Sequence, residues 1–301
     1  MILRTLALAI FISIPAAAQS PSGSTSQPAK TTKDGGKEKD KPAATWPKLD
    51  GAKSVELGKL IDDLKRAPTE EHVTNVLDKI SEFGNAAVPL LLESLSRQKP
   101  VPEDELSDEA RRLIQALELV IRKDDGPLLV ADAAHRSILI RRYALRKCGE
   151  YAVTAALSNA NKGLKDHDEG VRFEAALCCA AVGSTSGFGI LHKFARDHWP
   201  VYGARLRAAT EKSRSEEATE KCKPGLSAED WQDVCASLRL LSGWGTKAAV
   251  NDIAKHLDSS DHRIKEDAIN TLRGIVDNEQ PLEKLSAFDL AEQARAWRKR
   301  I

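Results

Sequence analysis

The feature that most constrains the fold of this chain is an internal repeat. The segment from Leu164 to Ala175 (LKDHDEGVRFEA) aligns without gaps with the segment from Leu257 to Ala268 (LDSSDHRIKEDA). Leucine, aspartate and alanine recur at three places, and residues of like character recur at three more. Such self-similarity indicates a fold that repeats one supersecondary unit, because each unit buries its apolar face against the next copy.

Each unit has the pattern of two helices joined by a short polar turn. The aspartate of the turn can cap the second helix, and a small residue near the middle of that helix permits close packing. Seven second helices are indicated by the marker residues Val76, Ala110, Ala144, Ala175, Ala208, Ala236 and Ala268. Their successive spacings of 34, 34, 31, 33, 28 and 32 residues predict an all-α protein.

These units resemble the HEAT-repeat family in its short bacterial form. The phrases AVPLLLESL (residues 87–95) and EGVRFEAALCCAAVG (residues 169–183) carry the resemblance. It implies an α-solenoid of about seven stacked antiparallel helix pairs over residues 46–301, with the second helices on the concave side. The register is interrupted by a proline-containing insertion at residues 97–104 and by a polar loop at residues 213–227.

The N-terminal part of the chain has the composition of an export signal followed by a tether. Arg4 precedes an apolar run, and a small-residue stretch ends at Ala18, so residues 1–18 are interpreted as a cleaved signal peptide. The run is too short to cross a bilayer. Residues 19–45 lack aromatic and large aliphatic side chains and are expected to form a disordered low-complexity tether. The protein is therefore expected to be periplasmic or extracellular, without a membrane span.

Charge and motifs argue against several function classes. The 45 basic and 44 acidic residues leave no basic excess for nucleic acid. The sequence contains no Gly-rich phosphate loop, G-x-S-x-G elbow or H-E-x-x-H pair. The polar groups at residues 166–169, and at His192, Asp197 and His198, are more typical of helix ends than of metal or acid–base sites. No catalytic residue, metal or cofactor is predicted.

The interpretation that follows is an exported, non-catalytic scaffold or adaptor that binds a protein or peptide partner, in a cell-envelope assembly. The alternative is a HEAT-like enzyme of the phycobilin-lyase or DNA-glycosylase type, because such repeats also occur in those families. Both families act inside cells, so the export signal opposes them. A lyase would need a groove for a tetrapyrrole.

The sequence also singles out side chains on the second helices and in the turns. Partner-binding candidates are Arg142, Arg146, Lys147, Trp199 and Trp244. Basic residues recur three places before the alanine marker, at Arg141, Arg172, Arg205 and Lys265. We expect this ladder to be structural, with each base bonding an acid or a carbonyl near the preceding turn; the HEAT resemblance implies such ladders between repeats.

Five cysteines occur in a chain that is expected to enter an oxidising compartment, so disulfides are permitted. Cys148, Cys178 and Cys179 fall at core positions of predicted helices. Cys222 lies in the polar loop and Cys235 begins the next helix, so these two are the candidates for a disulfide.

Overall fold

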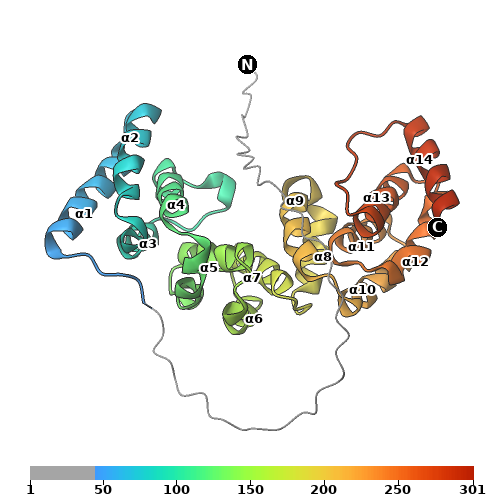
Figure 1. Cartoon of the computed structure of the whole chain (residues 1–301), viewed down its shortest axis with the longest axis horizontal. Helices are drawn as coiled ribbons and strands as arrows, with labels where there is room; N and C mark the ends of the chain where they lie inside the picture. Colours follow the sequence, from blue (N-terminus) through green and yellow to red (C-terminus); the bar gives the residue numbers. More distant parts are fainter. Residues whose placement is uncertain (1–44) are drawn as a thin grey trace, which may run out of the picture. The chain divides into compact units, whose positions relative to one another are not determined.

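The computed structural model describes residues 45–301, so the predicted signal peptide and nearly all of the predicted tether lie outside the described residues. Within residues 45–301 the chain is helical and contains no strand, which confirms the all-α prediction. No helix of this part is both long and apolar enough to span a bilayer. Figure 1 shows the helices following one another along the described part of the chain.

The helices of the described part have the following bounds. The α-helices are α1 (Gly51–Arg66), α2 (Glu70–Ser81), α3 (Val88–Ser96), α4 (Asp108–Val120), α5 (Ile138–Glu150), α6 (Leu157–Gly163), α7 (Glu169–Ala181), α8 (Phe188–Asp197), α9 (Trp199–Thr210), α10 (Glu216–Cys222), α11 (Trp231–Trp244), α12 (Val250–Ala254), α13 (His262–Leu272) and α14 (Ala287–Arg300). Short 3-10 segments include η2 (Glu103–Glu105), η3 (Lys123–Val130), η4 (Asp132–Ala134) and η7 (Lys223–Ser227).

The marker residues of the repeat lie where neighbouring helices pack. They fall in α2, α4, α5, α7, α9, α11 and α13, and all except Ala208 are buried. From α5 onward the packing runs between these helices in order, α5 on α7, α7 on α9, α9 on α11 and α11 on α13 (Figure 1). A small side chain at the contact lets two helix backbones approach closely, so the alanine periodicity reports this packing.

The polar turns supply the predicted caps. Asp168 Oδ1 accepts a hydrogen bond of 2.8 Å from the backbone N–H of Val171 at the start of α7. Asp261 caps α13 in the same way through the N–H of Arg263, at 2.9 Å. Each cap satisfies an N–H that lacks a partner within the helix and stabilises it by about 1 kcal/mol.

Helix α7 is buried on all sides. Ten of its thirteen residues are buried, because its sequence EGVRFEAALCCAA is apolar almost all round. Val171, Ala175 and Cys178 belong to a hydrophobic core that extends toward the N-terminus, whereas Phe173 and Leu177 belong to a core that extends toward the C-terminus. Helix α7 therefore joins the two cores.

Two segments depart from the expected helix pairs. Before α5, the 3-10 segments η3 and η4 replace a regular first helix; Pro127 lies within η3 and cannot donate to an α-helical ladder. Residues 213–227, expected to be a polar loop, contain α10. Ser215 caps α10, and its residues Ala218, Thr219 and Cys222 form a buried face.

The predicted disulfide between Cys222 and Cys235 is absent, which corrects the sequence interpretation. All five cysteines are free and buried. Cys222 lies on the buried face of α10, not in a loop, and Cys235 is buried in α11. Both thiols fill space as small apolar groups.

Burial should make these thiols unreactive. It raises the pKa of Cys148 and of Cys222 to about 12, and that of Cys179 to about 11. Because the thiolate is the reactive form, the native protein at pH 8 should show essentially no reaction with Ellman's reagent within minutes. The five thiols should all react once guanidinium unfolds the chain. Recovery of only three under denaturing, non-reducing conditions would instead reveal a disulfide.

Candidate functional site

Three of the predicted partner-binding residues lie on α5, and each of them already pairs with acids of this chain. Arg142 donates to Asp168 Oδ1 at 2.7 Å and to the carbonyl of Val101 at 2.6 Å. The Lys147 side chain is only 7% exposed and lies between two acids, Glu118 and Glu150. The expectation that these bases are exposed is therefore corrected: acids of α4 and of the turn before α7 pair with them.

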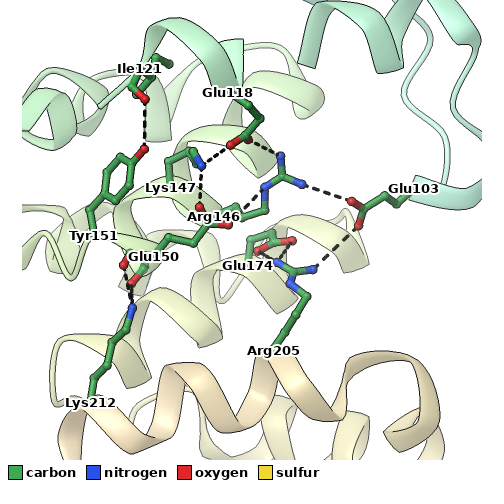
Figure 2. Close-up of polar contacts among 11 residues, drawn as sticks. Glu103, Glu118, Ile121, Arg146, Lys147, Glu150, Tyr151, Glu174, Arg205 and Lys212 are labelled. Carbon is green, nitrogen blue, oxygen red and sulfur yellow. Dashed lines mark hydrogen bonds and ion pairs between the residues drawn. The ribbon is translucent and has the colours of Figure 1, made fainter. Parts of the chain in front are cut away.

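Arg146 is the centre of an ion-pair network (Figure 2). Its guanidinium lies 3.2 Å from a carboxylate oxygen of Glu118, 3.2 Å from one of Glu103 and 3.9 Å from one of Glu150. Its Nε atom is buried and has no hydrogen-bond partner in residues 45–301. The acids come from three separate elements, so the pairing depends on the tertiary fold.

Glu174 is the most deeply buried acid of this network. It lies on α7, is 6% exposed, and accepts hydrogen bonds of 2.7 and 2.6 Å from Arg205 Nη2 of α9. Burial raises the pKa of Glu174, and Arg205 opposes that rise. The pair therefore links α7 to α9 through a charge that water does not solvate.

The basic ladder divides into residues of different roles. Arg141 donates to both carboxylate oxygens of Asp166, at 2.9 and 3.1 Å. Arg172 donates to the carbonyls of Asp166 and His167 at 2.8 and 2.9 Å. Arg205 bonds Glu174 instead, and the Lys265 side chain makes no hydrogen bond or ion pair in the described part of the chain. Arg141 and Arg172 therefore brace the turn before α7.

The two predicted tryptophans have different environments. Trp244, expected at a binding rim, is 1% exposed; its indole donates to Ser213 Oγ at 3.1 Å and its ring stacks near Phe188. That expectation is corrected, because the end of α11 is part of the core. Trp199, at the start of α9, faces a cavity of about 770 Å³.

The cavity beside Trp199, hereafter the Trp199 cavity, is formed by α9, α11, α13 and the chain before α14. Two guanidinium groups lie over the indole ring, with Cζ of Arg207 at 5.9 Å and Cζ of Arg239 at 5.2 Å from its centroid. These are cation–π distances. The other charged lining residues are Glu211, Arg263, Glu266, Asp267, Glu279, Glu283 and Lys284.

Arg207 is a cation without an acidic partner. It donates to Gln280 Oε1 at 3.2 Å and makes no ion pair in the described residues. Burial lowers the pKa of Arg207, because removal from water disfavours the charged form. A carboxylate that entered the cavity could pair with this guanidinium.

Asp267 is an acceptor with unused capacity. Its Oδ2 forms an ion pair with Arg239 Nε at 2.9 Å, where the two atoms are not aligned for a regular hydrogen bond, and the Cys235 thiol also approaches the carboxylate. Burial raises the pKa of Asp267 to about 6, and the positive charge of Arg239 opposes that rise. Asp267 lines the Trp199 cavity and its side chain is 14% exposed, so a donor N–H from a ligand could approach the carboxylate.

The sequence analysis missed these cavity residues, although a signal was present. Glu174, Arg207 and Asp267 each stand one residue before an alanine marker, on α7, α9 and α13. The position three before the marker, which was singled out instead, braces turns at Arg141 and Arg172 only. The position next to the marker carries the charged groups that line cavities.

The polar groups considered as metal or acid–base sets are used in packing. His192 lies 3.2 Å from Ser237 Oγ, and His198 packs against Phe194 and Tyr202. The described residues contain no group of three or more His, Cys, Asp or Glu side chains suited to hold a metal ion.

Comparisons with known proteins show a structural likeness. No family model and no curated protein matches this chain. Among solved structures, the chain is similar to the complex of CpcE and CpcF of phycocyanin lyase from Nostoc sp. PCC7120. The sequence identity is 16% and the TM-score 0.37, over 88% of this chain and 99% of that chain.

That likeness corrects two expectations of the sequence analysis. The similar structure is a lyase, which agrees with the alternative of a HEAT-like enzyme and not with a non-catalytic scaffold or adaptor. The non-enzymatic interpretation is therefore not kept. Similarity at this level does not transfer an activity, so the function must be argued from the chemistry of the cavity.

Proposed function

We propose that this chain is a ligand-handling protein of the phycobilin-lyase type, and that the Trp199 cavity holds a conjugated ligand of the open-chain tetrapyrrole class. The observation that carries the proposal is the combination, in one cavity, of an indole ring, an arginine without an ion pair in the described residues and a largely buried carboxylate.

The charges of the lining select the class of ligand. Four bases and five acids line the cavity, so a simple polyanion such as a polyphosphate would meet net repulsion. A ligand that carries both N–H donors and carboxylates suits a mixed lining. An open-chain tetrapyrrole has pyrrole N–H groups on its inner edge and two propionate arms on its outer edge.

Each part of such a ligand has a matching group. The conjugated system can pack against the edge of the Trp199 indole, a pyrrole N–H can donate to the Asp267 carboxylate, and a propionate can pair with Arg207. A cavity of about 770 Å³ lies within the range of sites that enclose ligands of this size.

Two finer features belong to the same proposal. The order of packing from α5 to α13 supports a HEAT-like α-solenoid of about seven helix pairs. The similar lyase structure is a complex of two subunits, so a protein partner is part of the proposal as well. Export remains a proposal from the first 18 residues, and the chemistry of the cavity is the same in either compartment.

Titration with biliverdin tests the proposal. The protein should shift the visible absorbance of the bilin and quench tryptophan fluorescence. Trp199→Ala should weaken binding by about tenfold or more, equivalent to ~1.4 kcal/mol, because the aromatic contact is lost. Phe288→Ala is the matched control, since Phe288 is exposed on α14 and does not line the cavity. Equal binding by the wild type and by Trp199→Ala would rule out this site.

The pH dependence of binding gives a second readout of the same titration. Asp267, with a pKa of about 6, is mostly neutral at pH 5 and mostly ionised at pH 7.5. An N–H donor binds an ionised carboxylate more strongly, so biliverdin affinity should rise across this range. Asp267→Asn should flatten this rise in affinity with pH. If the variant shows the same rise as the wild type, the pH dependence comes from the carboxyl groups of the ligand.

A further inference from the structure

A second feature lies outside the Trp199 cavity, where the segment of residues 97–107 between α3 and α4 reaches helices of later pairs. We call this segment the strap. The carbonyl of Val101 accepts a hydrogen bond of 2.6 Å from Arg142 of α5. The Glu103 carboxylate approaches Arg146 of α5 at 3.2 Å and Arg205 of α9 at 3.8 Å, as Figure 2 shows.

The strap is held loosely at its acidic end. The Glu103 side chain is 57% exposed, and its distance to Arg205 is longer than a hydrogen bond. Arg146 Nε is buried without a hydrogen bond, and Arg205 Nη1 makes none in the described residues. Two guanidinium groups thus retain donors that Glu103 does not satisfy.

Below the strap lies a cavity of about 420 Å³. Its strap side consists of Pro100, Val101 and Pro102, and its helix side includes Phe173, Phe194 and Tyr202. The three aromatic rings pack within 4.1 to 5.4 Å of one another, centroid to centroid. An apolar side chain could therefore enter next to Arg205, which also lines this cavity.

The charge balance of the network depends on Glu103. In Figure 2 four acids (Glu103, Glu118, Glu150 and Glu174) form ion pairs with three bases (Arg146, Lys147 and Arg205), whereas Lys212 donates to the backbone carbonyl of Glu150. Removal of the strap takes away the acid that Arg146 and Arg205 share. The uncovered groove would attract a carboxylate.

We propose that the strap is a removable cover and that Glu103 stands in for an acidic residue of a partner polypeptide. That residue would pair with Arg146 and Arg205, and a hydrophobic neighbour on the same segment would occupy the cavity below the strap. The occupant is thus an acidic peptide segment with an apolar side chain beside the acid. This inference uses a different cavity from the proposed function and does not depend on it.

Fluorescence anisotropy with a labelled hexapeptide of alternating glutamate and phenylalanine tests the inference. Glu103→Gln removes the internal competitor and should bind this probe about fivefold more tightly than the wild type, an effect that falls with salt. Glu105→Gln is the matched control, because Glu105 is an exposed acid of the same strap with no ion pair in the described residues. It should bind as the wild type does.

Two competitors complete the test. A hexapeptide with glutamine in place of glutamate should not compete, since it cannot pair with the arginines. Free glutarate should compete only at much higher concentration, because it leaves the aromatic cavity empty. Equal affinity of the wild type and Glu103→Gln would overturn the inference, and so would equal potency of glutarate and the acidic peptide.

Discussion

Replacing Arg205 with methionine should lower the free energy of unfolding by about 3 to 5 kcal/mol at neutral pH. The substitution leaves the Glu174 carboxylate buried without its hydrogen-bonding partner. Methionine retains much of the apolar volume of the arginine stem, so the lost stability measures the effect of removing the positive charge of Arg205. Urea denaturation at pH 7.5, followed by circular dichroism, measures it.

The pH dependence of the lost stability shows whether the loss comes from the unpaired Glu174 carboxylate or from loss of packing. Burial raises the folded-state pKa of Glu174 above its unfolded value, and without Arg205 the rise becomes larger. A raised carboxyl pKa favours the folded state at low pH, and this contribution is lost as the pH rises through the folded pKa. The deficit of Arg205→Met should therefore shrink between pH 7.5 and pH 5.

A control on the same helix is available. Arg207 has no acidic partner in the described residues, so Arg207→Met should cost less than about 1 kcal/mol. A similar cost for both variants, independent of pH, would show that the pair between α7 and α9 does not carry the stability assigned to it.

The second large effect should come from Gly187→Ala, a change of one methyl group. A Cβ at Gly187 would lie 2.7 Å from Cα and 2.7 Å from Cβ of Ala176, and the first of these belongs to the backbone of α7. Helices α7 and α8 must separate to admit it. We expect a loss of about 1 to 3 kcal/mol, measured by thermal and urea unfolding.

Gly189→Ala provides the matched control two residues later. A Cβ at Gly189 meets nothing within 4 Å, and alanine favours the α8 helix. This variant should be neutral or more stable than the wild type by up to about 1 kcal/mol. Equal stability of the two alanine variants would show that α7 and α8 adjust at no cost.

The helices were predictable where local periodicity decides the structure. The alanine marker identified the helices that pack in order from α5 to α13, and Asp168 and Asp261 were expected at turns where they now cap α7 and α13. Both signals act over a few residues. Helix α10 was missed because its exposed face is all charged, and only three residues form its buried face.

The candidate site was less predictable, because its state depends on partners distant in sequence. Arg142 and Lys147 were correctly placed on one helix, but the acids that pair with them, Asp168 and Glu118, lie 26 and 29 residues away. Nothing in a single sequence shows which charges are already paired. The wall of the Trp199 cavity formed before α14 follows no repeat and gave no signal either.

The burial of α7 in two cores has a consequence for how the molecule opens. If the helices on one side of α7 separate transiently, the residues on its other face stay packed, so its backbone amides remain protected from solvent exchange. The amides of α7 should therefore exchange only when both sides open together. When the helices on one side of α7 open, α7 also loses its packing on that side. A local fluctuation in one hydrophobic core therefore weakens the other core. In this way α7 makes the two blocks behave as one cooperative unit.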